Sequence, residues 1–153
     1  MDAIDIRDLQ AADVEGCRAV LEALPDWFGI PEAIDGYVTR LSALDGYVAI
    51  EGGRVVACLG LKRHGPRSIE IDVIAVRPEL HRAGLGALLV EHAAVRAQAV
   101  GCSILHMKTI GPSSDDTNYA KTRLFWEAVG FVPMEEMDIW TPTNPCLLMV
   151  KPL

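Results

Sequence analysis

The feature that most constrains the fold is a strand pattern followed at once by a helix that begins with glycine. In residues 68–76 (SIEIDVIAV) apolar residues largely alternate with other residues, which is typical of a β-strand. Arg77-Pro78 ends this pattern. The apolar-rich segment His81–Val100 has the length of a helix, which we expect from Gly84 onward. Helices usually begin with Ser, Thr, Asp or Asn, whose side chains cap the free amides, but Gly84-Leu85-Gly86 stands here. The sequence therefore predicts a strand, a tight turn and a helix whose first amides lack a side-chain cap.

The remaining segments predict further strands and helices on both sides of this unit. Apolar residues at helical spacing indicate helices at 11–24, 32–43 and 119–129, the last ended by Gly130. Strand patterns cover 4–7, 46–63, 103–109, 131–137 and 146–151, and 46–63 is expected to form a hairpin about Glu51-Gly52-Gly53. No linker or low-complexity segment interrupts the sequence, so residues 1–153 are expected to form one domain. This order predicts an α+β fold, in which helices flank a mixed, mostly antiparallel sheet.

Composition and charge exclude several classes of protein. Half of the residues are hydrophobic and 23% are charged, as in a soluble globular chain. The net charge of −7 argues against nucleic acid as a partner, because phosphate binding needs a basic surface. The most apolar helix pattern is interrupted by Glu91, His92 and Arg96, and the first ten residues are too acidic for a signal peptide, so no membrane association is expected. The four cysteines lie far apart without zinc spacing, which favours reduced thiols in a cytoplasmic protein with no metal site.

Uncapped amides at a helix start are suited to binding an anion. The helix dipole adds positive potential there, and glycine allows a phosphate to approach the backbone closely. Arg82, and His81 if protonated, would add charge complementarity. A P-loop is excluded because Ala87-Leu88 replaces its Lys-Ser/Thr, and a dinucleotide fingerprint is excluded because Leu89 replaces its third glycine. A pyrophosphate site is the functional interpretation, and a glycine-eased turn with only a structural role is the alternative.

Two motifs resemble those of the GNAT-type N-acetyltransferase family. VIAVRPELHRAGLGALL (73–89) resembles its acetyl-CoA-binding motif, with His81 where the family usually has Arg or Gln. TRLFWEAVGF (122–131) resembles its second motif, an aromatic pair on a helix that ends in Gly-Phe, and the order of elements matches along nearly the whole chain. The resemblance implies a GNAT-like fold, acetyl-CoA as the cosubstrate and transfer of the acetyl group to a primary amine. It also implies a set of cofactor-binding residues: Ile74, Val76, His81, Arg82, Ala83, Gly84, Leu85, Gly86, Ala87 and Tyr119.

Glu70 is the expected general base. Alternation puts Glu70, Asp72, Ile74 and Val76 on one face of the strand, and two carboxylates in such a row are unusual because burying a charge is costly. Glu70 falls where members of the family with an identified base often carry a glutamate that acts through a water molecule. The alternative is that Glu70 and Asp72 both reach solvent and only flank the cleft. The resemblance also implies that Ile74 and Val76 contact the pantetheine arm and thioester through their main chain.

The residue that would protonate the leaving thiolate departs from the family pattern. The second residue of the aromatic pair is often tyrosine in the family, but here it is Trp126, and indole has no usable acidic proton. Tyr119 lies seven residues earlier on the same helix face, where we expect it to bind the cofactor. We assign His64 and His106 no catalytic role, since lone histidines in strands are more often structural.

Three functions remain open from the sequence. The first is an N-acetyltransferase that uses acetyl-CoA and a small-molecule amine. The second is a CoA-binding sensor or interaction domain without transferase activity, and the third is an α+β domain whose glycine turn is structural. The identity of the acceptor cannot be read from the sequence, and the oligomeric state is open, with a homodimer compatible with it.

Overall fold

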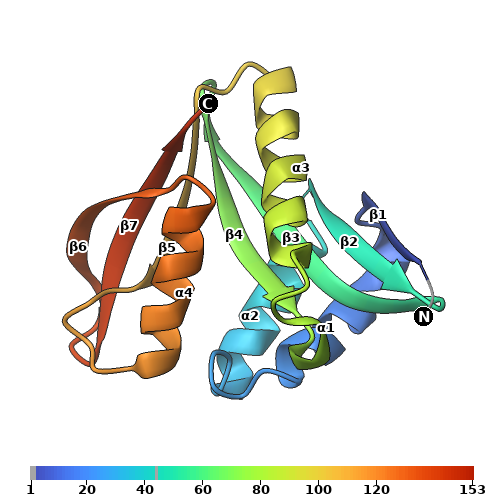
Figure 1. The fold of residues 1–153 in the computed structure, drawn as a ribbon, viewed down its shortest axis with the longest axis horizontal. Coiled ribbons are helices and arrows are strands. Elements are labelled where there is room, and N and C mark those ends of the chain that lie inside the picture. The colour runs from blue at the N-terminus through green and yellow to red at the C-terminus, as the bar shows by residue number, and fades with distance from the viewer. Residues whose placement is uncertain (1–2, 44) are drawn as a thin grey trace. The chain divides into compact units, whose positions relative to one another are not determined.

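The structure, a computed structural model, describes residues 3–43 and 45–153. Its elements, drawn in Figure 1, are β1 (Ile4–Asp8), the short 3-10 helix η1 (Ala11–Asp13), α1 (Val14–Glu22), α2 (Pro31–Leu41), β2 (Asp45–Glu51), β3 (Arg54–Gly65), β4 (Ser68–Val76), the short 3-10 helix η2 (Pro78–Leu80), α3 (Leu85–Ala99), β5 (Ile104–Ile110), α4 (Thr117–Ala128), β6 (Val132–Thr141) and β7 (Asn144–Pro152). The strands form a seven-stranded sheet in the order β1-β2-β3-β4-β5-β7-β6. β4 and β5 pair in parallel, whereas β1 with β2, β2 with β3, β5 with β7 and β6 with β7 are antiparallel. This confirms the predicted α+β fold with a mixed, mostly antiparallel sheet.

The chain divides into two compact units. The first contains Met1–Lys62 and Ile71–Val95, and the second contains Arg63–Glu70 and Arg96–Leu153. The boundaries fall inside β3, β4 and α3, so the sequence has no linker at these points. The described residues contain no helix that is long and apolar enough to cross a membrane.

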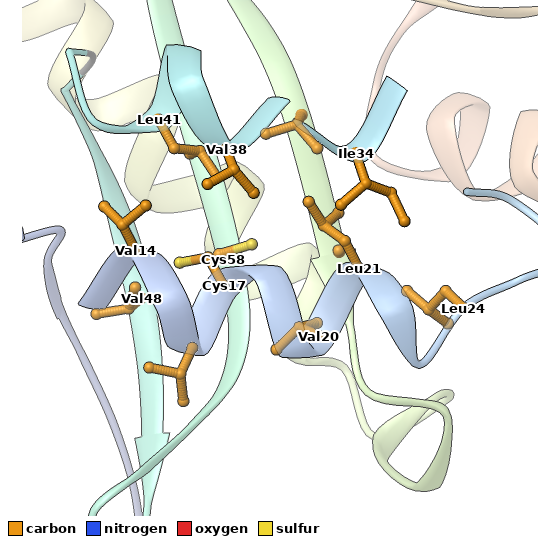
Figure 2. Close-up of a cluster of buried hydrophobic side chains, with 13 residues drawn as sticks. Val14, Cys17, Val20, Leu21, Leu24, Ile34, Val38, Leu41, Val48 and Cys58 are labelled. Carbon is orange, nitrogen blue, oxygen red and sulfur yellow. The ribbon is translucent and has the colours of Figure 1, made fainter. Parts of the chain in front are cut away.

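The first unit has a core that α1 and α2 cover with one apolar stripe each. Figure 2 shows the side chains of both helices gathered over the strands, with the sulfur atoms of Cys17 and Cys58 lying together. The hydrogen bond with Cys17, together with burial, raises the pKa of the Cys58 thiol, which keeps that thiol protonated and unreactive. The cluster consists of Val14, Cys17, Val20, Leu21, Leu24, Ile34, Val38, Leu41, Val48, Val55, Cys58, Val73 and Ala75.

A two-residue turn fixes the hairpin of β2 and β3, as the sequence predicts. Glu51 pairs with Arg54, and the two residues between them, Gly52 and Gly53, have φ angles of 57° and 76°. Positive φ at both central positions gives the turn a twist that matches its strands, and glycine adopts this conformation without a steric cost.

The second unit is organised around α4, which lies beside β5 in Figure 1. Trp126 is buried, with its ring centroid 5.2 Å from that of Phe125 and 5.0 Å from that of Phe131. Trp126 is therefore a core residue of this unit. β6 forms the edge of the sheet, and nine of its ten residues are exposed, Met137 being half-buried.

The start of α4 differs from the prediction, in which this helix begins at residue 119 and not at Thr117. Asp116 caps the helix: one of its carboxylate oxygens accepts hydrogen bonds from the amides of Asn118 at 2.9 Å and Tyr119 at 3.1 Å. This cap turns the end of the polar segment into the first helical turn. The helix predicted to begin at Gly84, in contrast, begins one residue later than expected, at Leu85.

Removing the cap should destabilise the fold measurably. Asp116→Ala leaves two helix amides without their acceptor, so we expect the free energy of unfolding in urea to fall by about 0.5–2 kcal/mol. Asp115→Ala is the matched control, because Asp115 is also exposed and precedes the cap by one residue. Equal stabilities of the two variants would contradict the assignment of Asp116 as the cap.

Candidate active site

One face of β4 carries the row of predicted site residues. Burial alternates along the strand, and Ile69, Ile71, Val73 and Ala75 are all buried on one face. On the other face Asp72, Ile74 and Val76 are half-buried, and only Glu70 is buried. The face that was expected to bind ligand is therefore the less covered of the two.

Glu70 is a buried carboxylate with both oxygens engaged, in the second unit. Its side chain is only 8% exposed; Lys108 Nζ donates to Oε2 at 2.5 Å, and His64 Nε2 lies 2.8 Å from Oε1. Burial alone raises the pKa of Glu70, but the hydrogen bonds and charges of Lys108 and His64 outweigh it, so the net pKa lies below the ordinary value. Glu70 is thus ionised at neutral pH, and the alternative that it merely reaches solvent is wrong.

The two histidines that were predicted to have no catalytic role lie beside this carboxylate. His106 is the register partner of Glu70 across the parallel pair β4 and β5, and its ring centroid lies 5.2 Å from that of His64. Burial lowers the pKa of His106, and the positive charges of His64 and Lys108 lower it further, against an opposing effect of Glu70. The alternation of His106 and Lys108 on one strand was the available signal, but the pairing that brings them to Glu70 is a tertiary contact.

The predicted phosphate-binding segment, residues 81–87, lies in the first unit. Arg82, with φ of 66°, and Gly84, with φ of 80°, both have left-handed backbone conformations. A side chain at Gly84 would meet no atom within 4 Å, so glycine is required there by the backbone angle and not by crowding. His81, Arg82, Ala83, Gly84 and Ala87 are exposed, Gly86 is half-buried, and Leu85 is buried.

The first amides of α3 lack a side-chain cap among the described residues, as the sequence predicts. Leu88 N donates to Gly84 O at 3.1 Å, which begins the helical hydrogen bonds. Within residues 3–43 and 45–153, the amides of residues 84–87 donate to no acceptor. Amides without an acceptor at the positive end of a fifteen-residue helix are able to hold an anion.

His81 connects this segment to the end of β4. Its Nε2 donates to the carbonyl oxygen of Val76 at 2.7 Å, and its ring lies edge-on to Trp27 with a centroid distance of 5.8 Å. This hydrogen bond from His81 therefore stabilises the turn between β4 and α3. Of the predicted cofactor-binding residues, the structure thus brings Val76 and His81 into direct contact.

Asp72, the other carboxylate of the row, is held by a cation from α2. Arg40 Nε donates to Asp72 Oδ2 at 2.9 Å, and the Asp72 side chain is 12% exposed. Its pairing contradicts the alternative in which Asp72 simply reaches solvent.

Tyr119 is half-buried and lies in the first turn of α4, in the second unit. Its backbone amide donates the hydrogen bond to Asp116 described above. Trp126, two turns further along α4, is enclosed by Phe125 and Phe131 and offers no acidic proton.

Comparison with solved structures places the fold among acetyltransferases. A Desulfovibrio desulfuricans protein described as a GNAT-family acetyltransferase superimposes with a TM-score of 0.84 at 21% identity, covering 98% of this chain and 99% of that one. A GNAT-family acetyltransferase from Elizabethkingia anophelis with acetyl-CoA bound gives 0.72 at 20% identity and covers 100% of both chains. The ribosomal-protein-S18-alanine N-acetyltransferase of Escherichia coli gives 0.77 at 18% identity and covers 98% and 94%. Curated protein sequences give no match.

A sequence model of the acetyltransferase (GNAT) family matches residues 12–131, a range that includes parts of both units. It contains the strand with Glu70, the turn before α3 and the helix with Trp126. Acetyl-CoA is the cosubstrate of GNAT acetyltransferases, and structures of this fold hold acetyl-CoA or coenzyme A. The chain belongs to the GNAT family of acetyltransferases.

Proposed function

We propose that this protein transfers the acetyl group of acetyl-CoA directly to a primary amine, with residues 1–153 acting as one N-acetyltransferase domain. The observation that carries the proposal is that the amides of residues 84–87 find no acceptor among the described residues, in a chain of the GNAT family. These amides fit the pyrophosphate of CoA, because several N–H groups and the helix dipole act on the same anion.

The other proposed contacts with the cofactor are arranged around this pyrophosphate site. Arg82 is exposed next to the amides and adds a positive charge for the phosphates. The main chain of Ile74 and Val76 would hold the pantetheine arm and the thioester, on the half-buried face of β4. Tyr119 would add a hydrogen bond to the cofactor. This arrangement fixes the acetyl group before the amine arrives, which lowers the entropic cost of the reaction.

Glu70 is the general base of the proposed reaction. An amine is mostly protonated at neutral pH, so it must lose a proton before its lone pair can attack the thioester carbonyl. Glu70 is ionised, and it would accept that proton through a water molecule. The C–N bond then forms, the nitrogen releases its second proton to water, the C–S bond breaks, and CoA leaves as a thiolate that takes a proton from water.

The partners of Glu70 serve the removal of the proton. His64 contacts Oε1 of Glu70 and its side chain is 38% exposed, so it can pass the proton from the buried carboxylate to solvent. Lys108 keeps Glu70 ionised between turnovers. No protein acid is needed for the thiolate, because a thiol has a modest pKa.

A CoA-binding module without transferase activity is the second candidate, and Trp126 favours it. The indole replaces a phenol that is frequent in the family, and it is enclosed by aromatic side chains. Release of free CoA from acetyl-CoA in the presence of a panel of amines separates the two candidates. Tight binding of CoA with no release for any amine would establish the module and reject the enzyme.

A negative charge in the first turn of α3 should oppose CoA while favouring the fold. Ala87→Glu places a carboxylate at an exposed position in the first turn of α3, where the helix dipole stabilises it, so we expect an unchanged or higher melting temperature. The same charge repels a pyrophosphate, and CoA affinity measured by calorimetry should fall by at least about tenfold. Ala87 is a better site for this test than Gly84, whose φ of 80° strains any side chain.

Ala87→Gln is the control for that experiment, because it has the same size without the charge. It should bind CoA with nearly the affinity of the unmodified protein. An Ala87→Glu variant that is folded and binds CoA equally well would reject residues 84–87 as the pyrophosphate site.

Replacement of the base should slow turnover without weakening the cofactor complex. Glu70→Gln retains hydrogen-bonding capacity toward Lys108 and His64 but cannot accept the proton, so kcat should fall by about 10²-fold or more. CoA affinity by calorimetry and the melting temperature are the controls for binding and folding. A fully active Glu70→Gln enzyme, alongside an inactive Asp72→Asn enzyme, would assign the base to the other carboxylate.

The pH dependence of the reaction should respond to Lys108. Lys108→Met removes a hydrogen bond and a charge that lower the pKa of Glu70, while burial, which raises it, remains. The pKa of Glu70 therefore rises, and activity is lost at a higher pH as the solution is acidified. The acid limb of the kcat/KM profile should move upward in pH, whereas Lys121→Met, which removes an exposed lysine of α4, should leave it in place. An unmoved acid limb in Lys108→Met would exclude Glu70 as the titrating base.

A further inference from the structure

Arg40 directs its guanidinium to an unexpected face of β4. It belongs to α2, whose apolar stripe packs in the core with Val73 and Ala75. Its Nε nevertheless donates to Asp72, which stands in the opposite row of the strand, with Ile74 and Val76. A cation is thereby fixed at the row of β4 that the proposed reaction uses.

The guanidinium is held in place with its terminal nitrogens available. Asp72 engages only Nε, and the part of the chain that the structure describes offers no acceptor to Nη1 or Nη2 of Arg40. The Arg40 side chain is 41% exposed, against 12% for Asp72. A guanidinium anchored through Nε still presents two parallel N–H donors at its tip, which is the geometry that binds a carboxylate.

Aromatic and glycine residues of the same region keep this donor pair oriented and accessible. The Arg40 guanidinium carbon lies 4.7 Å from the centroid of the Tyr37 ring, and Phe28 meets Tyr37 edge-on at 5.6 Å. Gly36 stands one turn before Arg40, where an added Cβ would lie 3.4 Å from Nη1. Glycine inside a helix costs stability, but at this position it leaves the tip of the guanidinium uncovered.

We propose that Arg40 binds a carboxylate of the acceptor, so that the substrate is an amine that also carries a carboxylate, such as an amino acid. This inference rests on the proposed function and specifies its acceptor. Before the acceptor substrate binds, Asp72 compensates the charge of Arg40. Its hydrogen bond to Nε also fixes the orientation of the two terminal N–H donors of the guanidinium. The Tyr37 ring covers one side of the guanidinium, and lower local polarity there strengthens a charge-assisted hydrogen bond.

The test compares amines that differ only in the carboxylate. CoA release from acetyl-CoA is measured with L-amino acids that lack a thiol, with β-alanine and with 4-aminobutyrate, each against its own primary amide. At least one acid should react with a kcat/KM at least about tenfold above that of its amide, since a charge-assisted pair is lost in the amide. Arg40→Gln should remove this preference by raising KM for the acid, and Arg40→Lys should restore part of it because the charge returns without the fork.

Arg18→Gln is the matched control. Arg18 also pairs with an aspartate, Asp35 of α2, at 2.7 Å, so the variant removes the same charge and also breaks an ion pair to that helix. It should retain the preference for the acid. A wild-type enzyme that acetylates acids and amides equally, or an Arg40→Gln variant that still prefers the acid, would overturn the assignment of Arg40.

Failure of this inference is distinguishable from failure of the proposed function. If CoA binds and only amines without a carboxylate are acetylated, the acceptor assignment is wrong and the transferase stands. If CoA binds and no amine reacts, both the acceptor assignment and the transferase are rejected in favour of a binding module. If CoA does not bind at all, the proposed function itself is rejected, and the acceptor assignment with it.

Discussion

A charge is buried in a protein at a cost of several kcal/mol unless a partner compensates it, and the surroundings of β4 follow from this rule. The strand carries two carboxylates in one row, and each meets a cation from a different element. Lys108 of β5 reaches Glu70, and Arg40 of α2 reaches Asp72. The apolar residues on the other face of β4 fix the strand, so the two carboxylates cannot turn away. The positions of these cations are therefore required by the fold, independently of the chemistry proposed for them.

The parts of the fold that depend on local chemistry could be predicted from the sequence. Ser68–Val76 was assigned with its observed ends because alternation and the following Arg77-Pro78 are local signals. The turn at Gly52-Gly53 and the uncapped start of α3 depend on backbone angles that glycine alone adopts freely. The start of α4 was missed because Asp116 lies within a polar run in which several residues could act as the cap.

The surroundings of the candidate base could not be predicted, because they depend on strand register. His64 and His106 each look like a lone histidine in the sequence, and only the pairing of Glu70 with His106 across two parallel strands brings one of them to the carboxylate. Parallel pairing joins residues that are far apart in the chain, and no turn fixes their register. The resemblance to the family supplied the candidate base, whereas its contacts with Lys108 and His64, which lower its pKa, came from the structure.

The exposed edge strand β6 has a consequence for the behaviour of the protein in concentrated solution. An edge strand presents a row of unpaired backbone groups, and apolar side chains such as Met134 and Ile139 would make it a template for the strands of other molecules. Glu135 and Asp138 are exposed on the same strand, and Pro133 removes one amide from it. Part of the acidity of this chain is therefore located where it discourages aggregation, and colloidal stability is a property of β6 that is separate from catalysis.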